Sequence, residues 1–265
     1  MINSTARVAG VLLALAVSAG LAGCATASPA ASPTPTATAT QDSLEGSITV
    51  FAAASLKSTF TELAEEFEAA HPGTTVELNF AGSADLVTQI AEGAPADVFA
   101  SADEKNMAKL IDAALVDGEP VNFATNVLEI AVPPDNPGNV HDINDLGRTG
   151  LKVVLCAETV PCGKAADATF KKARVVPSVV SREVDVKATL AKVKLGEADA
   201  AVVYHSDVVA ANGAVTGVPI RDPFNTSLRY PIITLADDAS TAEFVAYVLS
   251  PKGLATLQSF GLGAP

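Results

Sequence analysis

From about residue 47 to the C-terminus, short apolar segments alternate with longer segments of helical periodicity. Residues 48–52 are rich in apolar and β-branched side chains and predict a buried strand. The next segment carries apolar side chains at offsets of 0, 4, 7, 8 and 11, which form one face of a helix: Leu56, Phe60, Leu63, Ala64 and Phe67. Strands that alternate with helices predict an α/β fold with mostly parallel sheets flanked by helices.

The same alternation continues along the chain. We expect further strands at residues 76–80, 97–100, 127–132, 151–156, 200–204 and 231–235. We expect further helices near residues 86–93, 107–111, 163–173, 185–195, 241–249 and 253–260. The elements form two groups that meet near residues 124–127, and this grouping suggests two lobes. A length of about 220 residues suits one large domain or two small ones.

The N-terminus has the composition of a secretory signal. Arg7 supplies a basic start, and residues 8–23 form an apolar run that is too short and too rich in small residues for a membrane span. The run ends in Leu-Ala-Gly-Cys, which resembles a bacterial lipobox. Residues 1–24 are therefore expected to be a lipoprotein signal peptide with Cys24 as the lipidated residue, and two or three acyl chains would anchor the mature chain stably to the cell membrane. An ordinary signal peptide with an incidental cysteine is the alternative.

A low-complexity segment follows the signal. Residues 25–40 consist entirely of Ala, Ser, Thr and Pro. Such a segment buries too little apolar surface to offset the entropy of ordering it. We expect residues 25–45 to be a disordered tether between the membrane anchor and a folded body.

The charge of the chain restricts its partners. With 17 basic and 30 acidic residues, the net charge of −13 argues against binding to nucleic acid or to anionic lipid surfaces. No cofactor motif is found. The scarcity of cysteine and histidine argues against a zinc site, since the histidines are His71, His141 and His205.

Two cysteines remain after Cys24. Cys156 and Cys162 have five residues between them. In an oxidising compartment such a pair predicts a disulfide with a short loop. Two buried free thiols, which behave as small apolar side chains, are the alternative.

Two predicted strand-to-helix junctions carry a serine among small residues. Ser55 follows Val-Phe-Ala-Ala-Ala, and Ser83 follows Phe-Ala-Gly. Each serine could cap its own helix by accepting a bond from a free backbone N–H. The functional alternative is that the hydroxyl and nearby N–H groups bind an anion, assisted by the helix dipole. In parallel α/β sheets, ligands bind beyond the carboxyl ends of the strands, where both junctions lie.

Several segments together resemble periplasmic molybdate-binding proteins of ABC importers. The early segments are residues 48–56, 80–83 and 89–99, which read ITVFAAASL, FAGS and QIAEGAPADVF. The later segments are residues 160–163 and 196–204, which read VPCG and GEADAAVVY. The order and spacing of the early motifs agree with the family, and the resemblance extends from about residue 47 to the C-terminus.

The resemblance implies a two-lobed periplasmic-binding-protein fold of type II with the ligand in the cleft between the lobes. Lobe 1 would comprise residues 46–125 and 227–265, and lobe 2 residues 126–226. An oxyanion would be bound from lobe 1 by the hydroxyl and backbone N–H groups of Ser55 and Ser83. From lobe 2 it would be bound by the backbone N–H groups of Cys162 and Val186 and by the Tyr204 hydroxyl. Val186 is placed by its spacing to Tyr204.

The resemblance also implies what the protein does. It would be a monomeric, extracytoplasmic binding protein without enzymatic activity or cofactor, which captures molybdate or tungstate and delivers it to a membrane permease. Molybdenum would be bound as its oxyanion, with no direct coordination of the metal. Neutral N–H and O–H donors can satisfy a buried dianion without any lysine or arginine, so the acidity of the chain does not exclude this ligand.

A pocket that offers only donors also selects its ligand by protonation. Molybdate, tungstate and sulfate are fully deprotonated near neutral pH, whereas phosphate carries a hydroxyl group that needs an acceptor. Asp85, two residues after Ser83, could supply that acceptor, or it could complement the dipole in the first turn of its helix.

Two other functions stay open at this point. One is a binding protein of the same fold for sulfate or another oxyanion. The other is a secreted serine hydrolase that uses Ser55 with His205 and an aspartate, although the residues around Ser55 lack the G-x-S-x-G pattern of a nucleophile elbow.

Overall fold

The computed structural model describes residues 44–265. The expected signal peptide, the expected lipidation site Cys24 and residues 25–43 of the expected tether lie outside the described residues. Leu44 packs against the core, and the Ser240 hydroxyl donates a hydrogen bond of 3.4 Å to the carbonyl of Glu45. The folded body therefore begins inside the segment that we expected to be tether. Within residues 44–265, none of the helices has the length and apolar character needed to span a membrane.

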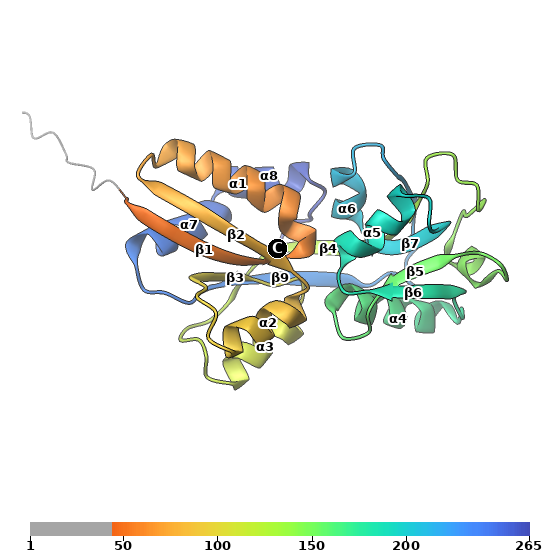
Figure 1. Cartoon of the computed structure of the whole chain (residues 1–265), viewed down its shortest axis with the longest axis horizontal. Coiled ribbons are helices and arrows are strands. Elements are labelled where there is room, and N and C mark those ends of the chain that lie inside the picture. The colour runs from red at the N-terminus through yellow and green to blue at the C-terminus, as the bar shows by residue number, and fades with distance from the viewer. Residues whose placement is uncertain (1–43) are drawn as a thin grey trace, which may run out of the picture. The chain divides into compact units, whose positions relative to one another are not determined.

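Lobe 1 is built on three parallel strands, with β1 pairing with both β2 and β3. Alternate side chains of β1 face opposite layers: Ile48 and Val50 pack with the apolar face of α1, whereas Phe51 packs with α2 and α3. Figure 1 shows α1 on one face of the sheet and α2 and α3 on the other. The elements are β1 (Gly46–Ala53), η1 (Ala54–Leu56), α1 (Lys57–Ala70), β2 (Thr74–Ala81), α2 (Ser83–Ala91), β3 (Val98–Ala100) and α3 (Glu104–Asp112).

Lobe 2 repeats the parallel arrangement around β5, which pairs with β6 and β7. In Figure 1, α4 lies on one face of these strands and α5 and α6 on the other. The elements are η2 (Ile143–Gly147), β5 (Val153–Cys156), α4 (Pro161–Ala173), β6 (Val179–Glu183), α5 (Val186–Lys194), β7 (Ala200–Tyr204), α6 (His205–Ala210) and β8 (Thr216–Pro219).

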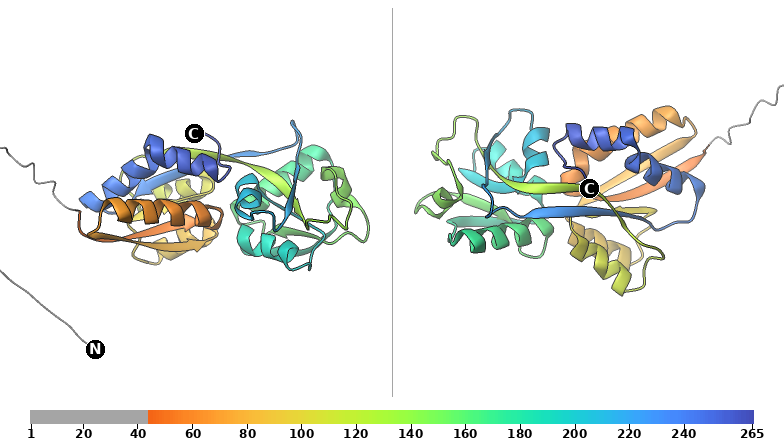
Figure 2. Two further views of the ribbon diagram at one scale, coloured as in Figure 1. Left: turned by 90° about the horizontal axis from the view of Figure 1, so that it is seen from above. Right: turned by 180° about the vertical axis from the view of Figure 1, so that it is seen from behind.

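Two long strands join the lobes. β4 (Val121–Val132) and β9 (Ser227–Thr234) pair antiparallel, and Figure 2 shows both passing from one lobe to the other. β9 also pairs with β3, and β4 pairs with β7 and β8. The strands thus form one sheet in the order β2-β1-β3-β9-β4-β7-β5-β6, with β8 beside β4.

The C-terminal helices α7 (Ala239–Leu249) and α8 (Pro251–Ser259) return to lobe 1. The Phe244 ring of α7 packs edge-on against Phe67 of α1, with ring centroids 5.3 Å apart. Aromatic rings in this arrangement stabilise the contact beyond the area that they bury. The return places the N-terminal and C-terminal segments of the described chain in the same lobe.

The predicted α/β architecture with two lobes is confirmed, and one feature of the sheet needs correction. The strands are parallel within each lobe, as predicted, but all pairs that involve β4 and β9 are antiparallel, so the sheet as a whole is mixed. The reason is topological, since one strand leaves lobe 1 and the other returns to it, and they must run in opposite directions. Four further elements were not predicted from the sequence: η2, β6, α6 and β8.

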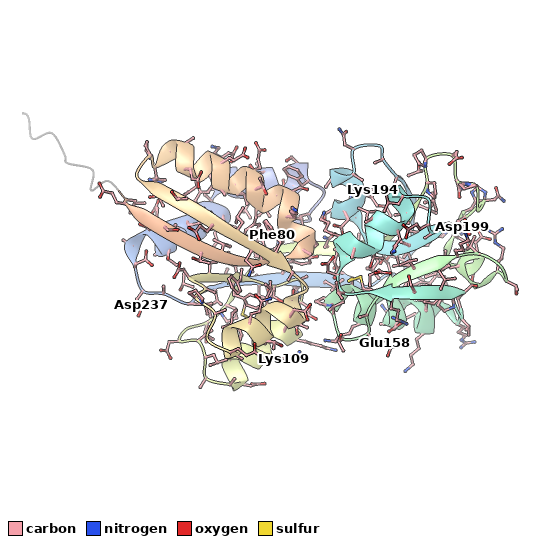
Figure 3. All side chains as sticks on the ribbon, in the orientation of Figure 1. Phe80, Lys109, Glu158, Lys194, Asp199 and Asp237 are labelled. Atoms are coloured by element: carbon pink, nitrogen blue, oxygen red, sulfur yellow. A yellow bond between two sulfur atoms is a disulfide. The ribbon has the colours of Figure 1, made fainter. Side chains whose placement is uncertain are left out.

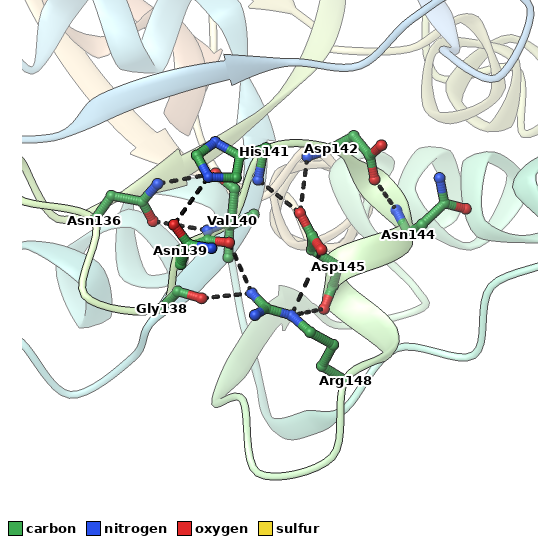
Figure 4. Close-up of polar contacts among 9 residues, drawn as sticks. All are labelled: Asn136, Gly138, Asn139, Val140, His141, Asp142, Asn144, Asp145 and Arg148. Atoms are coloured by element: carbon green, nitrogen blue, oxygen red, sulfur yellow. Dashed lines mark hydrogen bonds and ion pairs between the residues drawn. The ribbon is translucent and has the colours of Figure 1, made fainter.

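The polar loop between β4 and β5 is closed by hydrogen bonds from side chains to the backbone (Figure 4). The Asn136 amide donates to the carbonyl of Val140 at 2.9 Å and accepts from its N–H at 3.0 Å. The Asp145 carboxylate accepts from the N–H of His141 at 2.8 Å, and this bond lowers the pKa of Asp145. Within residues 44–265, no group of three or more His, Cys, Asp or Glu side chains is arranged to hold a metal ion.

Candidate functional site

A small cavity of about 20 Å³ lies where the two lobes meet. This volume is close to the space that one buried water molecule needs, so the cavity suits a ligand of few atoms. All five residues that the sequence analysis assigned to an oxyanion site line this cavity: Ser55, Ser83, Cys162, Val186 and Tyr204. The remaining lining residues are Ala53, Ala54, Gly82, Ala102, Val160, Pro161 and Asp185.

The two serines of lobe 1 lie at helix starts, but Ser83 does not cap its helix. The Ser83 hydroxyl oxygen accepts a hydrogen bond of 3.0 Å from the backbone N–H of Ala102, which follows β3. The residue at the N-cap of α2 is Gly82, and no side chain caps this helix. Ser55 lies in η1, which runs directly into α1, and its hydroxyl oxygen lies 3.1 Å from the hydroxyl oxygen of Tyr230. Both serines are buried.

These contacts determine what the serines can offer to a ligand. A serine hydroxyl has one hydrogen to donate and two lone pairs to accept with. Because Ala102 N–H occupies a lone pair of Ser83 Oγ, the Ser83 hydrogen is free to point into the cavity. A buried donor of this kind is stabilised by an acceptor, and an anion in the cavity supplies one.

In lobe 2, a disulfide shapes the start of α4. Cys156 at the end of β5 and Cys162 in the first turn of α4 are bonded, with their Cα atoms 5.8 Å apart (Figure 3). Gly163 is packed so closely that a Cβ atom there would overlap the carbonyl oxygen of Ala157. The helix starts at Pro161, two residues before the predicted start. Backbone N–H groups in a first turn have no acceptor within their own helix, so the N–H of Cys162, a residue that lines the cavity, has no helical acceptor.

The start of α5 is held by an acidic side chain and an ion pair. The Asp185 carboxylate accepts from the N–H of Ala188 at 2.8 Å, which leaves Val186 as the first residue of the helix. The next residue, Lys187, places its Nζ atom 2.8 Å from Oδ1 of the fully buried Asp207 in α6. Burial raises the pKa of Asp207, and the Lys187 ammonium counteracts this effect. The ion pair fixes α5 against the segment that carries Tyr204.

Tyr204 ends β7 with its hydroxyl group buried at the cavity. Within residues 44–265 this hydroxyl has no hydrogen-bond partner. Burial raises the pKa of Tyr204 well above its ordinary value, with smaller effects of Tyr230 and Asp207, so the hydroxyl keeps its proton. The backbone N–H of Tyr204 donates to the Asp207 carboxylate at 3.2 Å, which fixes the residue in place. A buried hydroxyl without a partner is costly, and a ligand that accepts from it removes that cost.

Apart from Asp185, the charged side chains of residues 44–265 lie away from the cavity. Lys109, Glu158 and Lys194 are exposed on the outside of the body (Figure 3). Asp185 is the sole titratable carboxylate among the lining residues, and it faces its own helix. Asp85 is exposed in the first turn of α2 and does not line the cavity, which favours the helix-dipole interpretation of that residue. Apart from Asp185, the cavity is therefore lined by uncharged residues, among them the hydroxyl-bearing Ser55, Ser83 and Tyr204.

The two lobes come close together at Gly82, just before α2. A Cβ atom on Gly82 would lie 3.1 Å from the carbonyl oxygen of Val184 and 3.1 Å from a methyl carbon of Val160. Both neighbours belong to lobe 2. A larger residue at this position would hold the two lobes apart.

We therefore expect Gly82→Ala to lower the affinity for the ligand by about tenfold, because the lobes close less readily around it. Calorimetric titration measures this change. Gly147→Ala is the matched control, since a Cβ atom on Gly147 meets the Val176 carbonyl at 3.2 Å within lobe 2 alone. Equal affinities of the Gly82→Ala variant and the unmodified protein would contradict the closure argument.

Comparison with known proteins now decides the family. Residues 48–263 match the family model of bacterial extracellular solute-binding proteins. The chain belongs to this family. The molybdate-binding protein ModA of Mycobacterium tuberculosis is 41% identical to this solute-binding protein over 259 residues, and the match covers 97% of each chain.

Solved structures share the fold of this solute-binding protein. The periplasmic molybdate-binding protein of Azotobacter vinelandii has a TM-score of 0.73 at 22% identity, and the match covers 82% of this chain and 99% of that one. The sulfate-binding protein SubI of Mycobacterium tuberculosis has a TM-score of 0.74 at 20% identity, covering 82% and 86%. These two likenesses show the fold alone and do not distinguish between the two anions that the structures are named for.

The solute-binding protein acts outside the cytoplasm, as its family does. Its site also contains groups that the sequence analysis missed. The Ala102 N–H holds Ser83, and Tyr230 of β9 contacts Ser55. Tyr230 lies almost 150 residues beyond Ser83 in a strand without a matched motif, and only the pairing of β9 with β3 and β4 brings it to the site.

Proposed function

We propose that this solute-binding protein captures molybdate, with tungstate as a second ligand, and delivers it to the permease of an ABC importer. The chain of Mycobacterium tuberculosis ModA, which is named for molybdate binding, matches almost the whole length of this protein. The cavity between the lobes supports the same ligand class, because its lining residues offer hydroxyl and backbone donors and include no lysine, arginine or histidine.

The observation that carries this proposal is the set of three buried hydroxyl groups around the cavity. Ser83 Oγ already accepts from Ala102 N–H, and the Tyr204 hydroxyl has no partner within residues 44–265. The Ser55 hydroxyl completes the set. Together with the first-turn N–H groups of α4 and α5, they would satisfy the oxygens of a fully deprotonated dianion. A protonated anion such as hydrogen phosphate would bring a donor that finds no acceptor.

The two lobes would move as units when they close around the ligand. Lobe 1 would comprise residues 46–125 and 227–265, and lobe 2 residues 126–226. Both boundaries fall within or beside the crossing strands β4 and β9, where the chain passes between the lobes. The ligand would draw the lobes together about these two strands, and its contacts with both sides would stabilise the closed state.

Several further properties belong to the same proposal. The protein would act as a monomer without cofactor, tethered to the membrane through a lipid on Cys24, and nucleic acid would not be a partner. The alternative function of a serine hydrolase with Ser55 as nucleophile has little support, because Ser55 and His205 contact other residues. The Ser55 hydroxyl contacts Tyr230, and Nδ1 of His205 lies 2.8 Å from the Glu129 carboxylate. A serine nucleophile would need a general base within hydrogen-bond reach.

Calorimetric titration of the chain from residue 44 onward with molybdate, tungstate, sulfate and phosphate tests the proposal. We expect tight binding of molybdate and tungstate, weaker binding of the smaller sulfate, and the weakest binding for phosphate. A higher affinity for sulfate than for molybdate would assign the protein to sulfate capture. Absence of heat with all four anions, together with turnover of an ester substrate, would replace the proposal with the hydrolase.

A further inference from the structure

A buried polar chain extends from the cavity into the crossing strands. Tyr230 of β9 is fully buried, and its hydroxyl oxygen contacts Ser55 Oγ at 3.1 Å and the side-chain nitrogen of Asn126 at 3.2 Å. Asn126 lies in β4, and its nitrogen also donates to Ser206 Oγ of α6 at 2.7 Å. The chain Ser55–Tyr230–Asn126–Ser206 thus runs from a residue of the cavity in lobe 1 to lobe 2.

The orientation of the Asn126 amide gives this chain a direction. The Asn126 side-chain oxygen accepts from the N–H of Val127 at 3.0 Å, so the nitrogen must be the atom that faces Ser206 and Tyr230. An amide nitrogen only donates. The Tyr230 oxygen is therefore the acceptor in its contact with Asn126.

The direction continues to Ser55. Burial raises the pKa of Tyr230, so the phenol keeps its hydrogen. With Asn126 donating to the oxygen, the phenol hydrogen has Ser55 Oγ at 3.1 Å as its acceptor, since the neighbouring Tyr204 hydroxyl has no hydrogen-bond partner within residues 44–265. A lone pair of Ser55 is thereby occupied, and its own hydrogen is directed elsewhere. Ser83 is in the same state, with Ala102 N–H in place of Tyr230.

We propose that Tyr230, oriented by Asn126, is a specificity-determining residue that favours Ser55 as a donor toward the cavity and thereby disfavours protonated oxyanions. This inference rests on the proposed function. A serine that is free to rotate can offer a lone pair to the hydroxyl group of hydrogen phosphate. A serine that already accepts from Tyr230 offers its hydrogen, which meets the hydrogen of that anion unfavourably. Tyr230 does not line the cavity and acts through Ser55.

The test is the ratio of the affinities for molybdate and phosphate, measured by calorimetry and competition at about pH 8, where both anions carry two negative charges. For Tyr230→Phe we expect this ratio to fall by at least about tenfold, because Ser55 can turn a lone pair toward phosphate. Tyr247→Phe is the control, since the Tyr247 hydroxyl donates to Glu66 at 2.6 Å outside the cavity, and its ratio should be unchanged.

A second variant tests the direction of the chain without removing the phenol. In Asn126→Asp, a carboxylate takes the place of the amide nitrogen and accepts from Tyr230, so the Tyr230 oxygen must accept from Ser55. We expect the ratio of molybdate to phosphate affinity to fall as it does in Tyr230→Phe. The added negative charge of the aspartate does not change this ratio, because it repels two anions of equal charge to the same extent. Ser55→Ala, which removes both the donor and the acceptor, should weaken molybdate binding without a gain for phosphate.

The outcomes separate the two proposals. If Tyr230→Phe and Asn126→Asp lower both affinities by the same factor, the residues have only a structural role and the inference is wrong. If the unmodified protein binds neither anion, the proposed function itself is wrong. Urea unfolding midpoints of all variants establish that the measured affinities belong to folded protein.

Discussion

The double variant Ser55→Ala/Ser83→Ala loses about a hundred- to ten-thousandfold in molybdate affinity. Each alanine removes one hydroxyl donor from a buried anion, and a hydrogen bond to a charged group contributes about 1.5–3 kcal/mol. Both serines are at most 4% exposed, so water cannot replace the lost donors. Each single variant should lose roughly the square root of the combined factor if the two donors act independently.

The measurement needs a stability correction and a control. Ser83→Ala leaves the N–H of Ala102 without its acceptor, which should also lower the unfolding midpoint. Titrations are therefore made well below the unfolding transition. Ser240→Ala is the matched control, because Ser240 is a buried serine whose hydroxyl contacts Glu45 away from the cavity. Undiminished molybdate affinity in the double variant would disprove the site assignment.

Lys187→Met lowers the free energy of unfolding by about 3 kcal/mol. The Asp207 carboxylate is fully buried, and Lys187 is its ion-pair partner at 2.8 Å. Removal of one partner of a buried pair costs about 3–5 kcal/mol, and the lower end applies here because the Lys187 side chain retains 26% exposure. Urea unfolding gives the value. A loss near zero would show that water hydrates Asp207 in the folded protein.

The pH dependence of this variant has a definite sign. Burial already raises the pKa of Asp207, and loss of the ammonium raises it further. A carboxyl group with a folded-state pKa above its unfolded value binds its proton more tightly in the folded state, so acidification recovers stability. We expect a larger loss at about pH 8 than at about pH 5.

Two controls identify the cause of the Lys187 effect. The double variant Lys187→Met/Asp207→Asn should recover most of the stability, because no buried charge remains. Lys192→Met removes the exposed partner of Glu197 in the same helix and should leave stability unchanged within error. A double variant as unstable as Lys187→Met would assign the effect to packing of the lysine side chain.

Most of the fold could be predicted because buried strands and amphipathic helices have clear periodicity. The exceptions have physical reasons. β6 lies at the edge of the sheet and carries the exposed Val179 and Val180 together with polar residues, so its pattern resembles a loop. β4 begins at Val121, six residues before the predicted start, because Asn122 and Asn126 interrupt the apolar pattern. Asn126 is nevertheless buried, since its amide is satisfied by Tyr230 and Ser206.

The candidate site shows the same division. Ser55, Ser83 and Tyr204 lie in short motifs next to strand ends, where local sequence already indicates a helix start or a ligand position. Tyr230 and Asn126 act through contacts between residues more than 100 positions apart in the chain, as in the bond from Asn126 to Tyr230. No local pattern encodes such a contact. The direction of their hydrogen bonds depends on the Val127 N–H, which only the folded backbone places.

Within residues 44–265, the cavity is lined by no histidine, lysine or arginine, and this restricts how pH could act on a bound ligand. The hydroxyls and amides around it keep their protons across the physiological pH range, and the Asp185 carboxylate is engaged by its own helix. Acidification at the cell surface therefore gives no signal for unloading. If the site binds an oxyanion as proposed, the anion leaves when the lobes open about β4 and β9 and withdraw the donors, so unloading would follow a conformational change and not a change of pH.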